Sequence, residues 1–215
     1  MQNALFEDRD SCIRPELPGA ELALWPHWLS TGEADALLAK LMAGIDFEQH
    51  RLRLFGRSVD APRLSCWIGD PHAVYRYSGT RFSPHPWTPA LARLRERVEA
   101  ACGARFDSVL ANLYRDGDDT MGWHSDDEPE LGPAPVIASV SLGAPRRFRL
   151  RGRDAAAAKL DLELTHGSLL RMAGDTQRNY RHALPRSRRV HDARLNLTFR
   201  RIVQPATVGI GGGGR

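Results

Sequence analysis

The feature that most limits the fold is a change in hydrophobic period after Gly103. Before this residue the apolar positions recur at helical spacing, whereas after it they alternate with polar ones in short stretches separated by Gly, Pro and Asp. Six such stretches predict strands at residues 108–114, 136–142, 147–151, 159–164, 167–172 and 193–202. Consecutive strands without intervening helices are typical of a β-sandwich or barrel.

Two helices are predicted before these strands. Ser30 and Glu33 have the spacing of a capping box and begin a helix over residues 30–43. Thr88 is the N-cap candidate of a second helix, which has Pro89 at its first position and ends at Gly103. We therefore expect an α+β protein in which two N-terminal helices pack on one sheet of a β-rich core.

Length and composition favour one globular domain. The 215 residues, 42% hydrophobic and 26% charged, exclude a mostly disordered chain or a disulfide scaffold. The longest uncharged stretch, residues 132–145, has three prolines and is too short to cross a membrane. Acidic residues near the N-terminus and an odd number of cysteines, three, predict a cytoplasmic protein. We expect residues 1–15 and 206–215 to be flexible around a single domain, 16–205.

The charges are unevenly distributed, although the net charge is only +4. Residues 146–201 contain fifteen Lys and Arg against five Asp and Glu, whereas residues 116–130 contain seven acidic residues. Clustered arginines favour a polyanionic partner, because they release counterions from a phosphate backbone. The alternative is a solvated basic face without a partner.

The last predicted strand carries polar residues on one face. Side chains alternate along a strand, so Arg194, Asn196, Thr198 and Arg200 share one side, opposite Leu195, Leu197 and Phe199. Two arginines six residues apart lie about 20 Å apart along the strand. Inside a barrel they can hold a dicarboxylate, whereas on an outer sheet face they are merely solvated.

A second candidate site is His124-Ser125-Asp126, because residues two positions apart on one strand project to the same side and can share a metal. His182 lies further along the chain. Two histidines and one carboxylate form the facial triad that selects non-haem Fe(II) and leaves coordination positions open for a 2-oxo acid and dioxygen. A zinc site with an open position and three unrelated surface residues are the alternatives.

Together, these motifs resemble the AlkB family of Fe(II)- and 2-oxoglutarate-dependent dioxygenases, which repair alkylated nucleic acids. The resemblance covers residues 106–202 and rests on Asn112-Leu113-Tyr114, His124-Ser125-Asp126, His182 and the run 194–200. It implies a double-stranded β-helix, or jelly roll, that uses Fe(II), 2-oxoglutarate and O2. The iron ligands it implies are His124, Asp126 and His182. The residues it assigns to 2-oxoglutarate are Asn112, Tyr114, Arg194, Asn196 and Arg200.

Within that family, the chain resembles most the branch that repairs duplex DNA in animal nuclei. Residues 45–85 would be the nucleotide-recognition region, with Phe55 as the aromatic finger that replaces an extruded base and Arg63 beside the gap. Tyr77 stands where that branch has phenylalanine and would stack on the base. The other residues that the resemblance assigns to the substrate are Tyr75, Ser78, Asp127, Glu128, Arg188 and Arg189.

The resemblance predicts a DNA-repair enzyme. Because nothing in the sequence suggests an obligate interface or a membrane span, we expect a monomer that works away from membranes. It would demethylate N-alkylated bases of the 1-methyladenine and 3-methylcytosine type in single- or double-stranded DNA, releasing formaldehyde and succinate. Such lesions are also easier to extrude than sound base pairs. Two alternatives remain open, because a fold does not determine a function. One is an oxygenase that acts on RNA or protein, and the other is a nucleic-acid binder without enzymatic activity.

Overall fold

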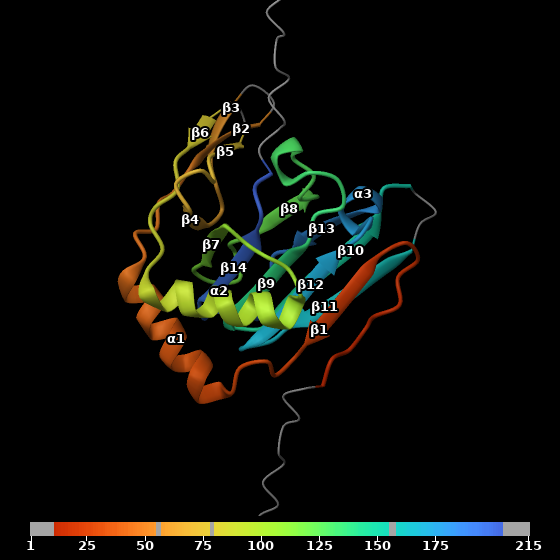
Figure 1. Ribbon diagram of the computed structural model, residues 1–215, viewed down its shortest axis with the longest axis horizontal. Coiled ribbons are helices and arrows are strands. Elements are labelled where there is room, and N and C mark those ends of the chain that lie inside the picture. Colours follow the sequence, from red (N-terminus) through yellow and green to blue (C-terminus); the bar gives the residue numbers. More distant parts are fainter. Residues whose placement is uncertain (1–10, 55–56, 78–79, 155–157, 204–215) are drawn as a thin grey trace, which may run out of the picture.

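Two antiparallel sheets face each other in the computed structural model, which describes residues 11–54, 57–77, 80–154 and 158–203 (Figure 1). The larger sheet has the order β1 (Glu21–Trp25), β12 (Ser168–Ala173), β9 (Ile137–Gly143), β14 (Arg194–Arg200), β7 (Ser108–Tyr114) and β4 (Leu64–Gly69). The smaller sheet has the order β11 (Lys159–Leu164), β10 (Arg146–Gly152), β13 (Tyr180–Leu184) and β8 (Met121–His124).

Strand β14 lies inside the larger sheet, paired with β7 on one side and β9 on the other. All seven of its residues are buried, because one face lies under the helices and the other faces the smaller sheet. The alternative of a solvated outer face is therefore excluded. The polar face of this strand becomes the floor of an internal cavity.

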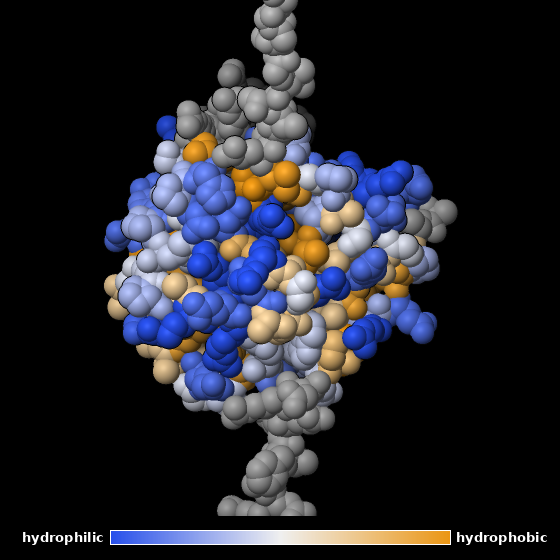
Figure 2. Space-filling model, viewed as in Figure 1, coloured by the Kyte–Doolittle hydropathy of each residue, from blue (hydrophilic) through white to orange (hydrophobic). Residues whose placement is uncertain are grey.

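The two predicted helices are confirmed and cover the outer face of the larger sheet (Figure 1). Helix α1 (Thr31–Gly44) begins with the capping box of Ser30 and Glu33. Helix α2 (Pro89–Cys102) begins at Thr88 and ends at Gly103, which has the left-handed conformation that glycine adopts most easily. The surface over these helices is mostly hydrophilic, as expected for amphipathic helices on a sheet (Figure 2).

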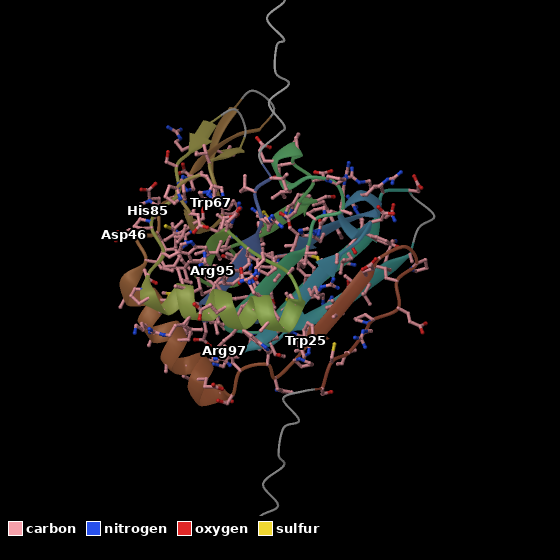
Figure 3. All side chains as sticks on the ribbon, viewed as in Figure 1. Trp25, Asp46, Trp67, His85, Arg95 and Arg97 are labelled. Carbon is pink, nitrogen blue, oxygen red and sulfur yellow. The ribbon has the colours of Figure 1, made fainter. Side chains whose placement is uncertain are left out.

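Two arginines of α2 tie this helix to its neighbours (Figure 3). The Arg97 guanidinium lies 5.2 Å from the ring centroid of Trp28 and forms an ion pair with Glu33, the capping residue of α1. Arg95 lies over Trp87, 4.7 Å from its ring centroid, and donates a hydrogen bond to Asp70. The helix layer is thereby joined to the loops on either side of it.

Apolar side chains from both sheets fill most of the space between them. Leu150 and Leu164 of the smaller sheet belong to the same buried cluster as Ile137, Leu170 and Met172 of the larger one. Since the two sheets pack on each other, the polar residues between them must pair with each other or with a ligand.

Two short hairpins lie beside this core, within the predicted recognition region (Figure 1). They pair β2 (Arg51–Leu54) with β3 (Arg57–Asp60), and β5 (Tyr75–Tyr77) with β6 (Thr80–Phe82). Short helices η1 (Pro129–Leu131) and α3 (Thr176–Asn179) complete the described structure.

The α+β class is confirmed, and each of the six predicted strands is present with ends within two residues of the prediction. The structure adds strands that alternation did not indicate, including β1, β8 and β13. Near the N-terminus, Ile13 and Leu24 exchange two backbone hydrogen bonds of 2.8 Å, which hold Ile13 against β1. Within the described ranges, no helix has the length and apolar character needed to span a bilayer.

Candidate metal centre and acid pocket

His124, Asp126 and His182 converge between the sheets, although His182 lies 56 residues after Asp126 in the sequence. Strands β8 and β13 pair so that His124 and His182 are directly opposite. One ligand atom from each of the three side chains lies within 4.8 Å of the other two. This geometry suits a single metal ion held by two imidazoles and one carboxylate.

Both histidines are arranged to offer a ring nitrogen to a metal. Burial lowers the pKa of His182 to about 3, so its ring is neutral at physiological pH and offers a lone pair. Nδ1 of His124 lies 2.8 Å from the Gly122 carbonyl oxygen, which can only accept a hydrogen bond. This contact occupies Nδ1, which leaves Nε2 as the nitrogen that can bind a metal.

Asp126 is held in its ionised form. Burial by itself raises the pKa of this carboxyl, but the charge of Arg200, with which it forms a buried ion pair, contributes to a net lowering. The Asp126 amide donates to Oε1 of Gln177 at 2.9 Å. His124 and Asp126 do not lie on one strand as expected, because β8 ends at His124 and Asp126 is in the loop beyond it. The contacts with Arg200 and Gln177 position Asp126 instead.

Arg194 occupies the other end of the polar face of β14. Its guanidinium is buried, donates to Ser141 at 2.9 Å and to Asn196 at 2.7 Å, and lies 5.3 Å from the Tyr114 ring centroid. Burial lowers the pKa of Arg194 to about 10, which still leaves the group charged at neutral pH. Its Nε has no hydrogen-bond partner among the described residues, so a carboxylate fits here.

One narrow cavity contains both the triad and Arg194. Its polar lining continues through Asn196, which accepts from Ser139 at 2.8 Å and donates to Thr198 at 2.8 Å. The apolar part of its wall is formed by Met121, Phe148, Met172 and Leu184. A cavity with a fixed cation at one end and metal ligands at the other suits a small acid that carries a second carboxylate.

Asn112 and Tyr114, the other residues predicted to bind the acid, also line the cavity. Arg63 lies next to them rather than at the surface. It is buried, and its Nε donates to Oδ1 of Asn112 at 2.9 Å. The structure thus brings Arg63, predicted to contact the substrate, into contact with the acid pocket.

The remaining predicted substrate residues that the structure describes with their side chains do not line this cavity: Asp127, Glu128, Arg188 and Arg189. Asp127 is half-exposed and forms an ion pair with Arg153, while Arg188 and Arg189 are exposed in the loop between β13 and β14. Phe55 and Ser78 lie outside the described residues. Tyr75 and Tyr77 belong to β5, but their side chains also lie outside the described part.

Besides the residues of the apolar wall, three polar residues of the site were missed in the sequence. Ser139 and Ser141 lie two positions apart on β9, so the alternation that identified the polar face of β14 also applied to them. Gln177 had no comparable signal. It lies in the short helix α3, and only the tertiary structure brings it to Asp126.

Comparison with known proteins agrees with this geometry. Residues 21–200 match the family model of the 2OG-Fe(II) oxygenase superfamily, which implies Fe(II), 2-oxoglutarate and O2. The solved structure of OsALKBH1 covers 89% of this chain and 100% of its own, with a TM-score of 0.59 and 18% identity. This similarity supports the predicted jelly-roll fold.

Two relatives place the chain within the superfamily. It is 37% identical to alpha-ketoglutarate-dependent dioxygenase alkB homolog 3 of Rattus norvegicus over 85% of this chain, but spans only 64% of that relative. It is 40% identical to DNA oxidative demethylase ALKBH2 of Homo sapiens, with 80% of this chain and 69% of the relative covered. The chain therefore belongs to the AlkB family of 2OG-Fe(II) oxygenases.

Proposed function

We propose that this protein is a DNA-repair dioxygenase that oxidatively demethylates N-alkylated bases. Its substrates would be of the 1-methyladenine and 3-methylcytosine type, and its products the repaired base, formaldehyde and succinate. The observation that carries the proposal is the buried triad of His124, Asp126 and His182 in one cavity with Arg194. The similarity to ALKBH2, a DNA oxidative demethylase, supports the choice of substrate.

The three triad residues would hold Fe(II), and Arg194 would bind the distal carboxylate of 2-oxoglutarate. When bound, this metal couples decarboxylation of the acid to oxidation of the substrate's methyl group. Asp126 offsets the metal's charge and is kept ionised beside Arg200. The apolar wall around His182, including Phe148 at 5.1 Å between ring centroids, limits access of water to the reacting groups.

The charges near the opening support a nucleic-acid substrate. Arg188 and Arg189 are exposed on the loop that follows β13, the strand that carries His182. This loop is held to the loop before β8, where Arg186 pairs with Asp118 at 2.7 Å and Ser187 donates to the Gly117 carbonyl. An anchored basic loop beside the cavity suits the phosphates that flank an extruded base.

We further propose that the protein acts as a monomer on single- and double-stranded DNA in a reducing compartment such as the cytoplasm. Its three cysteines, Cys12, Cys66 and Cys102, are free thiols. Burial raises the pKa of Cys66 to about 11 and that of Cys102 to about 12, so neither is a reactive thiolate. Free, unreactive thiols are consistent with a protein that stays reduced and folds without disulfides.

The deciding experiment supplies Fe(II), 2-oxoglutarate and air with 1-methyladenine or 3-methylcytosine in single-stranded DNA, duplex DNA or RNA. We expect formaldehyde and a loss of one methyl mass from the DNA oligonucleotides. Repair confined to RNA would assign the enzyme to RNA instead. Binding of methylated DNA without decarboxylation of 2-oxoglutarate would identify a binder that is not an enzyme.

Replacing Arg188 and Arg189 with glutamine should weaken DNA binding and reduce its salt dependence. Each phosphate contact contributes about 0.7–0.9 to the slope of log K against log salt concentration, so the double variant should lose about 1.5 from this slope. Fluorescence anisotropy at several salt concentrations measures it. Arg105→Gln, at an exposed residue three positions beyond α2, is the control. An unchanged slope would remove these arginines from the DNA interface.

A further inference from the structure

Arg153 lies directly after β10 and holds the residues on both sides of Asp126. One nitrogen of its guanidinium donates to the Ser125 hydroxyl at 3.0 Å, to the Gln177 carbonyl at 3.4 Å and to the carboxylate of Asp127. Its own backbone is fixed, because the Arg153 amide donates to the Asn179 carbonyl at 3.0 Å. The guanidinium is therefore directed at Asp127 by several contacts.

The ion pair between Arg153 and Asp127 lies where a substrate can contact it. Asp127 directly follows the metal ligand Asp126, and the Asp127 side chain is 52% exposed while Asp126 is buried. The Asp127 carboxylate is therefore open to solvent one residue from the buried ligand Asp126, where it can meet a base that approaches the triad. Whether this carboxylate attracts a positive charge depends on how strongly Arg153 already neutralises it.

We propose that Arg153 sets the preference between cationic and neutral alkylated bases by pairing with Asp127. The inference rests on the proposed function and concerns the substrate charge that the site accepts. The pair is partly exposed, with 36% of the Arg153 side chain accessible, so solvent weakens it and a cationic base can compete for the carboxylate. Arg153 is thus a specificity-determining residue that acts through Asp127.

The test compares two methylated pyrimidines of nearly equal shape. At neutral pH 3-methylcytosine is cationic, whereas 3-methylthymine is neutral. Both are placed in the same oligonucleotide sequence, so the phosphate contacts are identical, and kcat and KM are measured for each. The variants are Arg153→Gln, Asp127→Asn and the double variant. Arg149→Gln is the matched control, because Arg149 forms a similar half-exposed pair with Asp161 on the neighbouring strand.

Arg153→Gln should raise the ratio of kcat/KM for 3-methylcytosine over 3-methylthymine by about twofold to fivefold, the range expected of a partly exposed pair. The change should lie in KM. Asp127→Asn should lower the same ratio, and adding Arg153→Gln to Asp127→Asn should change it no further. Arg149→Gln should leave it as in the native protein.

Several outcomes would overturn the inference. A ratio that stays constant in Arg153→Gln, while the native protein demethylates both bases, refutes the role of Arg153 but leaves the proposed function intact. An equal loss of activity on both bases would indicate that Arg153 only stabilises the loop. If the native protein demethylates neither base under any condition, both proposals fall together.

Discussion

Replacing Asp126 with asparagine is expected to lower formaldehyde release from methylated DNA by at least about 100-fold, since the change removes an anionic metal ligand. The amide keeps the size of the side chain but carries no charge to offset the metal. It also leaves the buried Arg200 guanidinium without its carboxylate, and breaking a buried ion pair costs about 3–5 kcal/mol. Anaerobic metal titration and the formaldehyde assay measure the two effects separately.

Controls distinguish a lost ligand from a lost fold. Asp161→Asn removes an exposed carboxylate that pairs with Arg149 on the outer side of the smaller sheet, and should leave metal binding and activity unchanged. Thermal unfolding shows whether Asp126→Asn is still folded at the assay temperature. Binding of methylated DNA should persist in the folded variant. Activity equal to that of the native protein would overturn the assignment of Asp126 as a ligand.

The β-rich core could be predicted because its strands follow simple rules. In β14 polar and apolar residues alternate without exception. The polar face, which carries Arg194 and Arg200, is the floor of the cavity. Strand β8 has only four residues, including Gly122, so its alternation is too short to recognise. Strand β1 is nearly continuous in its apolar character, which does not distinguish a strand from a buried helix segment.

The metal triad shows where local reasoning ends. The pair His124 and Asp126 is close in sequence, but its expected geometry on one strand was wrong, because Asp126 lies beyond the end of β8 and is positioned by Gln177 and Arg200. No local pattern marks His182. It was chosen because a second histidine completes a set of two imidazoles and one carboxylate, and it reaches the site because β13 pairs with β8.

Charged residues were the hardest to place. Arg63 and Arg153 look like ordinary solvated arginines in the sequence, yet one is buried against Asn112 and the other pairs with Asp127. Each contact joins residues that are at least 26 positions apart. Such pairs depend on the packing of several strands, so neither periodicity nor composition can reveal them.

Replacing Arg194 with glutamine should raise KM for 2-oxoglutarate by about 30-fold or more, because truncating one partner of a buried charge pair costs about 2–5 kcal/mol. The native Arg194 is charged throughout the physiological pH range, since its pKa is lowered only to about 10. Arg201→Gln is a suitable control, because Arg201 is exposed one residue beyond β14. Steady-state demethylation at varied 2-oxoglutarate gives KM for both variants.

A second acid makes the Arg194 prediction specific to its charge. Pentanoic acid with a 2-oxo group has the same reacting end as 2-oxoglutarate but no distal carboxylate. The native protein should bind it far more weakly than 2-oxoglutarate, whereas the Arg194→Gln variant should discriminate little between the two acids. If the variant lost affinity for both acids equally, Arg194 would be supporting the cavity wall through Ser141 and Asn196 rather than binding a carboxylate. If discrimination persisted in a folded variant, another cation, such as the neighbouring buried Arg146, would have to bind the distal carboxylate.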